Sequence, residues 1–262
     1  MSDIIVIKLG GLAASDVNAL GALAGEIADE RAIQPVIVHG GGAAVSTWSR
    51  RLGTEPRFED GIRMTSVEDM EIVEMVLGGS VNTQVVRTFC ANNHKAVGLS
   101  LSDCAMVKGV AVSDSAANRT ARPGAAQTEI LRYLVVGGYT PVVCSVGTME
   151  DGGPCNINAD QAALAIARSL SAKQLVFLSD VPGVLVAESI QSDMDENDIA
   201  GALAGGHISG GMIPKVQSAL HATAHGVGSV IIGRYTEQGD FKRLLAGASG
   251  TRIQAAQAKA GE

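Results

Sequence analysis

Aromatic residues are scarce in this sequence, at only 3% of its 262 residues. Because hydrophobic residues still make up 46% of the chain, we expect a core of Ala, Val, Ile and Leu, as in parallel sheets covered by helices. No apolar run approaches the ~20 residues that a membrane-spanning helix needs. The composition is that of a folded globular chain and not of a disordered one, since only 18% of the residues are charged.

Runs of basic residues and paired cysteines are also missing. The formal net charge is −7, with no Lys/Arg cluster that would predict nucleic-acid binding, so positive charge for an anionic substrate must be placed locally. The four cysteines form no C-x-x-C pair, which favours buried thiols in a reducing compartment. The first apolar run is short, is broken by Lys8 and does not resemble a secretory signal. We therefore expect a cytoplasmic protein without a nucleic-acid or membrane partner.

Two familiar nucleotide-binding motifs do not occur. The chain has no Walker A sequence, G-x-x-x-x-G-K-[ST], and no dinucleotide fingerprint, G-x-G-x-x-G, at its strand-to-helix junctions. The missing fingerprint disfavours a dehydrogenase.

Short Val/Ile-rich runs alternate with Ala/Leu-rich segments of helical periodicity. This alternation predicts one α/β domain with a largely parallel sheet between helices. A hairpin strand at 106–112 and a polar loop at 113–124 are expected outside that sheet. Strands are predicted at 4–8, 35–39, 96–101, 140–145, 174–178 and 229–232, with an edge strand at 251–254. Helices are predicted at 16–31, 43–52, 66–77, 81–92, 127–137, 159–170 and 212–224.

The first two strands end in glycine-rich turns. Lys8-Leu9-Gly10-Gly11 places a positive charge where open α/β sheets bind ligands, although a solvated lysine before a tight turn has the same pattern. His39-Gly40-Gly41-Gly42 opens a helix whose N–H groups favour an anion, although an ordinary strand-to-helix turn is the alternative. We interpret His39 as a hydrogen-bonded structural residue and not as an acid, base or metal ligand.

Two polar motifs follow later in the chain. Arg63, just before a predicted helix, suits a carboxylate clamp or is simply a surface arginine. In Asn156-Ile157-Asn158-Ala159-Asp160 the polar side chains share one side if the segment is extended, and Asp160 is alternatively the cap of the next helix.

Two further motifs occupy the C-terminal third. In the segment from Ser179 to Leu185, Pro182-Gly183 fits a type II turn after a strand. In Gly210-Gly211-Met212-Ile213-Pro214-Lys215 a lysine stands near a helix N-terminus, where the dipole disfavours a cation. That conflict indicates a functional lysine that faces an anion.

In order, these motifs resemble those of the amino acid kinase family. The set is K-x-G-G, H-G-G-G, G-x-R, N-x-N-A-D, L-S-D-V-P-G-V and G-G-M-I-P-K, and the resemblance extends from about Ile4 to Ile253. Residues 58–63 and 70–77 are most similar to the branch that phosphorylates the γ-carboxylate of N-acetyl-L-glutamate in arginine biosynthesis.

The resemblance implies a three-layer αβα sandwich. Its N-terminal lobe, about residues 1–172, would bind the acyl-amino acid and its C-terminal lobe, about 173–262, would bind ATP, with Mg²⁺ held through the nucleotide. Lys8 and Lys215 would stabilise the transition state, and Asp160 would organise both lysines. The implied substrate residues are Gly41, Gly42, Arg63, Asn156 and Asn158. The implied nucleotide residues are Gly10, Gly11, Asp180, Val181, Pro182, Gly183, Val184, Leu185, His207, Ile208 and Ser209.

The chemistry of a carboxylate acceptor agrees with these residues. With a pKa of roughly 4.3, the acceptor is already ionised at neutral pH and needs no general base. What the reaction requires is positioning of the two substrates and neutralisation of charge on the moving phosphoryl group.

The sequence departs from the family pattern in two places. Residues 116–125 read AANRTARPGA where the family commonly has a G-H-V-G-like turn, which leaves a different acylated or carrier-linked acidic amino acid as an alternative substrate. A catalytically inactive nucleotide-binding regulator is a second alternative, opposed by the joint presence of Lys8, Asp160 and Lys215. The chain starts almost at its first strand, without the N-terminal helix of arginine-inhibited relatives. We therefore expect an arginine-insensitive homodimer.

Overall fold

A single eight-stranded sheet forms the centre of the protein, with strand order β14-β16-β15-β11-β1-β2-β8-β5. The structure, a computed structural model, describes residues 3–11, 16–59, 61–208 and 210–255. The six strands from β15 to β5 are mutually parallel, which confirms the predicted mainly parallel sheet. They are β1 (Asp3–Leu9), β2 (Ile33–His39), β5 (Ala96–Ser100), β8 (Thr140–Cys144), β11 (Gln174–Ser179) and β15 (Ser229–Arg234).

The strand predicted at the sheet edge is not at the edge. Strand β16 (Thr251–Ile253) runs antiparallel to β15, and the two-residue strand β14 (Asp193–Met194) pairs with its other side. The strand predicted at 251–254 is therefore present, but β14 and not this strand forms the edge of the sheet. Strand β14 could not be predicted because two residues are too few to show an alternating pattern.

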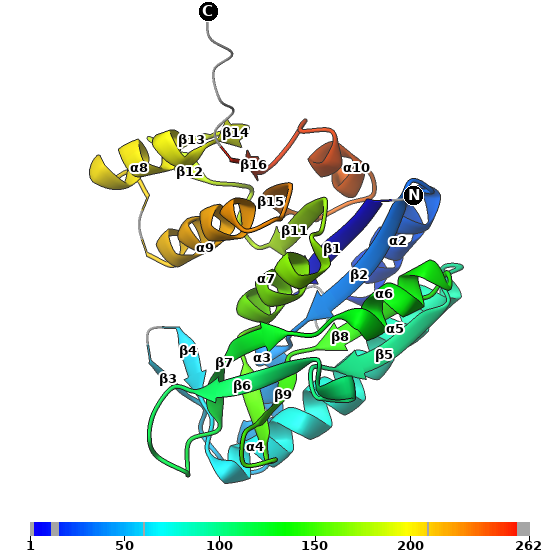
Figure 1. Ribbon diagram of the computed structural model, residues 1–262, viewed down its shortest axis with the longest axis vertical. Coiled ribbons are helices and arrows are strands. Elements are labelled where there is room, and N and C mark those ends of the chain that lie inside the picture. Colours follow the sequence, from blue (N-terminus) through cyan, green and yellow to red (C-terminus); the bar gives the residue numbers. More distant parts are fainter. Residues whose placement is uncertain (1–2, 12–15, 60, 209, 256–262) are drawn as a thin grey trace, which may run out of the picture.

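Helices cover both faces of the sheet and produce three layers (Figure 1). Each layer of helices has its own hydrophobic core. Alternation along β1 supplies both cores, because Ile5 and Ile7 face one and Val6 faces the other. One face carries α2 (Val17–Asp29), α3 (Gly42–Arg51), α4 (Val67–Val73), α5 (Asn82–Ala91) and α10 (Asp240–Leu245). The other carries α6 (Glu129–Val136), α7 (Ala159–Leu170), α8 (Glu196–Ala204) and α9 (Met212–Ala224).

The two helices predicted at 66–77 and 81–92 form one continuous helical run. Ser66 starts α4 with a capping box, and a π-helical stretch, Glu74–Val81, joins α4 to α5. This wider stretch contains two glycines and directs Leu77 and Val81 toward the turn that follows β2.

A small closed barrel, in the order β10-β7-β6-β9, lies beside the main sheet. Its strands are β6 (Val107–Ala111), β7 (Thr120–Ala126), β9 (Val146–Met149) and β10 (Pro154–Ile157). The loop predicted at 113–124 is therefore wrong from Thr120 onward, because proline and glycine inside β7 concealed the strand. Short hairpins are formed by β3 (Arg57–Glu59) with β4 (Ile62–Met64) and by β12 (Leu185–Val186) with β13 (Ser189–Ile190). A 3-10 turn spans Asp103–Ala105.

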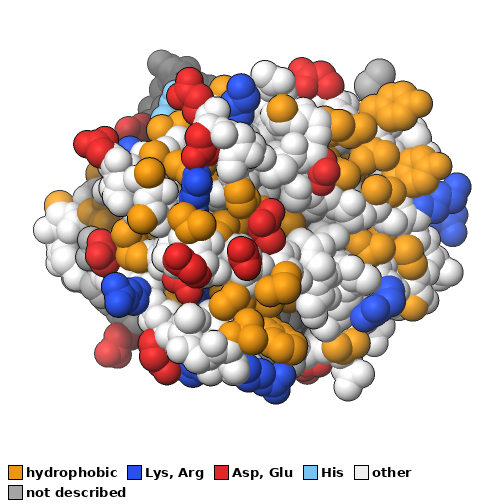
Figure 2. Space-filling view, turned by 90° about the horizontal axis from the view of Figure 1, so that it is seen from below, with side chains coloured by type: hydrophobic (Ala, Val, Ile, Leu, Met, Phe, Trp, Pro, Cys, Tyr) orange, Lys and Arg blue, Asp and Glu red, His pale blue; other side chains and the backbone are white. Residues whose placement is uncertain are grey.

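The surface shown in Figure 2 mixes charge signs. Acidic and basic side chains are interspersed among apolar ones on this face, without a continuous basic area. Among the helices of the described ranges, none has the length and apolar character required to cross a bilayer.

Candidate functional site

The main cavity lies at the carboxyl ends of β1, β2 and β11. Strand β1 pairs with β2 on one side and with β11 on the other, so the chain leaves β1 at a point where strand order reverses, which is where open α/β sheets bind ligands. The cavity has a volume of about 490 Å³. Its polar lining includes Lys8, Arg63, Asn156, Asn158, Asp160, Asp180 and Lys215.

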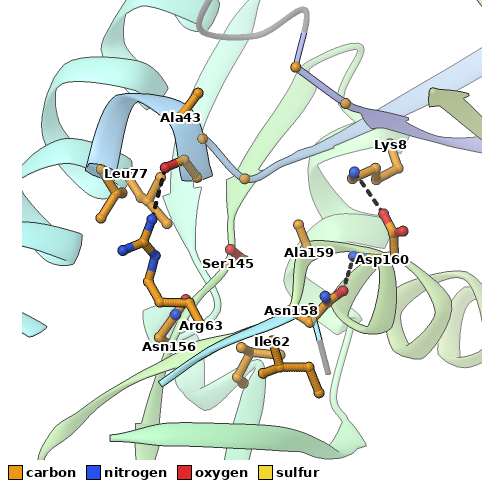
Figure 3. A pocket seen from close by; sticks show the side chains of 18 of the residues that line it. Lys8, Ala43, Ile62, Arg63, Leu77, Ser145, Asn156, Asn158, Ala159 and Asp160 are labelled. Atoms are coloured by element: carbon orange, nitrogen blue, oxygen red, sulfur yellow. Dashed lines mark hydrogen bonds and ion pairs between the residues drawn. The ribbon is translucent and has the colours of Figure 1, made fainter. Parts of the chain in front are cut away.

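Two lysines from opposite ends of the chain meet at one carboxylate. Lys8 Nζ lies 2.7 Å from Asp160 Oδ1, as Figure 3 shows, and Lys215 Nζ lies 3.6 Å from Asp160 Oδ2. The side chains of Lys8 and Lys215 are only 16% and 20% exposed, so solvent screens their charges weakly. Oδ1 is itself buried and has no hydrogen bond beyond the Lys8 ion pair in the described part of the chain. Two positive charges against one negative charge leave an excess positive charge at the cavity.

Each of these three groups is placed by a different element. Lys8 is in β1, Asp160 is in the first turn of α7, and Lys215 is in the first turn of α9. The suggestion that Asp160 caps α7 is wrong, because Asn158 is the N-cap and its Oδ1 accepts hydrogen bonds from Asp160 N (2.8 Å) and Gln161 N (3.3 Å). An extended backbone at Asn158 lets its short side chain take this role. The Asp160 carboxylate is consequently available to both lysines.

A hydrogen-bond chain extends from Lys215 toward the C-terminal part of the site. Lys215 Nζ donates to Ser179 Oγ at 3.2 Å, and Ser179 Oγ donates to Asp180 Oδ1 at 3.0 Å. The Ser179 hydroxyl, the backbone of Asp180 and the charges of Lys215 and Arg234 hold the pKa of Asp180 below its ordinary value. Asp180 is therefore a carboxylate at neutral pH.

Sequence analysis did not select Arg234. It ends β15 at the same sheet edge, and its Nε donates to Asp180 O at 2.7 Å. Its place at the end of an apolar strand was an available signal, because Lys8 was selected from the same kind of position.

Glycines shape the turns after β1 and β2. A Cβ atom on Gly10 would lie 2.5 Å from Leu178 O, and one on Gly41, where φ is +155°, would lie 2.8 Å from a Leu77 methyl carbon. Only glycine fits at these two positions. The groups that leave no room for a side chain are the backbone of Leu178 and the core side chain of Leu77, and not a ligand. A Cβ atom on Gly42 would meet nothing within 4 Å. Gly42 lines the cavity at the start of α3, where the first helical N–H groups lack helical partners.

Arg63 closes the end of the cavity near α3. It lies in β4 with 9% of its surface exposed, and its Nη2 donates to Gly42 O at 3.0 Å and to the Ser46 hydroxyl. The Arg63 guanidinium carbon lies over the Phe58 ring, 4.8 Å from its centre, and burial lowers the pKa of Arg63. The surface-arginine alternative is therefore wrong.

Two polar side chains of the barrel support this end of the site. Thr120 Oγ1 accepts from Thr65 N at 2.9 Å and donates to Arg63 O at 3.0 Å. Asn156, on β10, donates through Nδ2 to Thr65 Oγ1 at 3.0 Å. The segment that departs from the family pattern thus holds the strand that carries Arg63.

His39 has the structural role that its sequence context predicted. It is fully buried, its Nδ1 donates to Gly40 O at 2.8 Å, and its Nε2 accepts from Asn82 Nδ2 at 3.0 Å. Burial lowers the pKa of His39 to about 4, so the ring is neutral at pH 7. A neutral ring with both nitrogens occupied cannot act as a base or bind a metal.

The residues implied for nucleotide binding are only partly gathered at the surface of the site. Asp180 lines the main cavity, and Pro182 lines a neighbouring cavity of about 470 Å³ together with Arg234, Thr236 and Asp240. Val181 packs against the core, and Leu185 is exposed on β12.

The remaining described residues of that group line neither of these two cavities. The side chains of Val184 and Ile208 are buried in the hydrophobic core, and His207 is exposed beside Gly205. Ser209 lies outside the described residues. The type II turn at Pro182-Gly183 is wrong, because φ of Gly183 is not positive, and this glycine is required instead because a Cβ atom there would lie 2.8 Å from Thr251 Oγ1.

No group of three or more His, Cys, Asp or Glu side chains suited to a metal ion is present in the described ranges. The carboxylates that line the main cavity are Asp160 and Asp180. Because Asp160 is occupied by two lysines, the donor set suits a metal held mainly by phosphate oxygens of a ligand and not a protein-bound ion.

Comparisons with known proteins identify the family and the fold of this chain. The amino acid kinase family matches residues 3–234. Acetylglutamate kinase of Symbiobacterium thermophilum is 38% identical over 246 residues, covering 87% of this chain and 83% of that protein, and the enzyme of Roseiflexus sp. is 40% identical over 225 residues, covering 85% of each. A Streptococcus mutans structure is 27% identical with a TM-score of 0.77, covering 98% of this chain and 100% of that one. N-acetylglutamate synthase of Neisseria gonorrhoeae, 20% identical, shares the fold with a TM-score of 0.83, over 97% of this chain and 60% of its own.

Proposed function

This chain belongs to the amino acid kinase family, and from that premise we propose that it transfers the γ-phosphoryl group of ATP to the γ-carboxylate of N-acetyl-L-glutamate. The convergence of Lys8 and Lys215 on Asp160 is the observation that carries the proposal. Acetylglutamate kinases that are 35–40% identical over most of the chain support the choice of acceptor.

The site provides charge for the phosphoryl transfer. The acceptor oxygen attacks the γ-phosphorus, the bond to the β-γ bridging oxygen breaks, and ADP leaves with that electron pair. Lys8 and Lys215 would offset the negative charge on the transferring group, and Asp160 would hold the two ammonium groups at a fixed separation. The N–H groups at the start of α3, including that of Gly42, would donate to phosphoryl oxygens. We assign no general base because the acceptor is already ionised.

The acceptor would lie between α3, β4 and α7. Arg63, whose Nη2 is used by Gly42 and Ser46, retains other N–H groups for the α-carboxylate of the substrate. The amide nitrogen of Asn158 can donate to the acyl-amino acid, since the capping interaction uses only its oxygen. Gly41 shapes this part of the cavity, and Asn156 supports the strand that carries Arg63 through its hydrogen bond to Thr65. Val45, Ile62 and Leu77 would provide apolar lining for the acyl group.

The nucleotide would bind to the C-terminal lobe, about residues 173–262. The boundary with the N-terminal lobe would lie near residue 172, although one sheet runs through both lobes. Gly10 and Gly11 line the cavity beside the phosphates, and Asp180, Pro182 and Arg234 lead from it to the neighbouring cavity. Mg²⁺ would be held by nucleotide phosphate oxygens near Asp180, where it supplies charge neutralisation. We also propose a cytoplasmic homodimer, for which a mass measurement in solution tests the oligomeric state.

A hydroxamate assay tests the acceptor directly. Purified protein with Mg-ATP and hydroxylamine should form N-acetylglutamyl hydroxamate, with ADP release, and should act poorly on glutamate, aspartate and N-acetylaspartate. The variant Lys215→Met should lose this activity while keeping its fold. Absence of turnover with N-acetyl-L-glutamate, together with turnover of another acceptor on the panel, would refute the substrate and leave the phosphotransferase assignment intact.

A second candidate is a kinase of the same fold that acts on another acylated or carrier-linked acidic amino acid. The contacts of Thr120 with the backbone of Thr65 and Arg63 favour it, because the unusual segment 116–125 supports the strand that carries Arg63. The inactive-regulator alternative predicts ATP binding without turnover of any acceptor, which calorimetry beside the same panel would detect.

A further inference from the structure

A second groove, of about 920 Å³, lies between β7, α7 and α9 and is separate from the phosphoryl site. Figure 1 shows α7 and α9 beside each other with β7 next to α7. The lining contains two arginines, two histidines and no aspartate or glutamate. Acidic residues outnumber Lys and Arg by 27 to 20 in the chain, so a groove without a carboxylate is a local reversal of charge. The basic lining residues are Arg122, Arg168, His221 and His225.

Three of these side chains form a contact network. Arg168 Nη1 donates to His221 Nε2 at 3.1 Å, which requires that nitrogen to be unprotonated. His225 Nδ1 donates to His221 O at 2.7 Å, and the two imidazole rings lie 4.1 Å apart. Desolvation first, then the charges of His225 and Arg168, lower the pKa of His221. Arg168 and His225 thus lie against His221, and the two arginines give the groove lining a positive charge.

Stabilisation of helix ends accounts for only one member of this basic cluster, His225, which binds the His221 carbonyl group in the last turn of α9. The last carbonyl groups of α7 are already bound by Arg132, whose Nη2 donates to Ser169 O at 3.2 Å and Leu170 O at 2.6 Å. Arg168 lies in the last turn of α7 but directs its guanidinium to His221 across the groove. Arg122, on β7, has no ion-pair partner within the part of the chain that the structure describes. The positive charge of the groove is thus left without a compensating protein group.

We propose that this groove binds a compact anion with two or more negative charges, either a polycarboxylate or a phosphate ester. The two arginines can each make paired N–H contacts with a carboxylate or phosphate. Gln161, Gln217 and Ser218 line the same groove and add neutral donors. The basic side chains of the groove lie toward the C-terminal ends of α7 and α9, and neither Asp160 nor Lys215 is among the lining residues, so the ligand would not compete with ATP for those groups. The proposal does not depend on which reaction the protein catalyses.

Calorimetric titration with two probes, citrate and pyrophosphate, tests this site. The variant carrying both Arg122→Gln and Arg168→Gln should bind at least one probe roughly 10–100-fold more weakly than the wild type, as expected for the loss of charge-assisted contacts. A charge-matched control with Arg31→Gln and Lys95→Gln, both exposed and outside the groove, should bind as the wild type does. Lys8→Met should retain the same binding event, which separates it from anion binding at the phosphoryl site.

The outcomes divide clearly. Groove-dependent binding of citrate alone identifies a polycarboxylate site, and groove-dependent binding of pyrophosphate alone identifies a phosphate site. If the double arginine variant does not fold, Gln217→Glu, which adds a negative charge at an exposed lining position, should weaken binding instead. Equal affinities of both probes for wild type and groove variants, or no binding at all, would overturn the proposal.

Discussion

Replacement of Lys8 by methionine removes one ammonium group and preserves the length of the side chain. In the structure this ammonium lies 2.7 Å from Asp160 Oδ1 and lines the cavity. A unit charge about 4 Å from a phosphoryl oxygen contributes roughly 4 kcal/mol at an effective dielectric constant of ~20. That energy corresponds to about 10³ in rate, close to the roughly 10²–10³-fold cost of deleting an oxyanion donor. We expect Lys8→Met to lower kcat by about 10²–10³-fold.

The assay is the rate of ADP release with N-acetyl-L-glutamate, measured over a range of both substrates. Because the lost charge acts mainly on the transition state, kcat should fall much more than KM rises. Lys173→Met is the matched control, since Lys173 is 60% exposed and pairs with Asp3 at the other end of the sheet. A thermal melt establishes that each variant folds. If Lys8→Met folds and turns over at the wild-type rate, the catalytic assignment of the two lysines is wrong.

Three further predictions concern the acceptor end and the core. Arg63→Lys should raise KM for the acceptor by roughly 10–100-fold and affect kcat less, because lysine lacks the planar pair of donors. Steady-state kinetics measure both parameters, and a change in kcat alone would show that the assignment of Arg63 is wrong. Gly41→Ala should lower the free energy of unfolding by about 1–3 kcal/mol in urea titrations, because φ is +155° and the new methyl would meet Leu77. His39, whose pKa falls from 6.5 to about 4 on folding, binds a proton in the unfolded chain but not in the folded one between these values. Stability should therefore fall by about 3 kcal/mol as the pH drops through that window, and in His39→Gln this loss should disappear.

The parallel sheet could be predicted because its strands are short, apolar and separated by amphipathic helices. Helix α2 is an example: its Asp16 cap accepts from two backbone N–H groups, and its buried residues recur at helical spacing. Of the barrel strands, the sequence indicated only the hairpin strand at 106–112, which is β6, and the others could not be predicted in the same way. Strand β7 contains proline and glycine, which ordinarily indicate a loop, and it is stable because β6 and β10 pair with it. One of these partners, β10, follows β7 in the sequence only after α6, β8 and β9.

In the candidate site, too, some residues could be predicted from local sequence and others could not. Lys8, Asp160 and Lys215 could be selected because each stands near the end of a strand or in the first turn of a helix, a local feature that places a side chain at an edge of the sheet. That Asn158 caps α7 and that Arg234 supports Asp180 required coordinates, since each depends on which of several polar groups is nearest. The core positions of Val184 and Ile208 likewise follow from packing and not from the motif.

The sequence by itself determined the alternation of strands and helices and the residue types at the strand ends, because periodicity and glycine turns are properties of a few neighbouring residues. Only the tertiary structure decided that Lys8 and Lys215 share one carboxylate and that four basic side chains line a groove without an acidic one. The physical reason is that Coulomb interactions depend on distance in space. Distances between β1, α7, α9 and β7 are set by the packing of the whole sheet and its two cores.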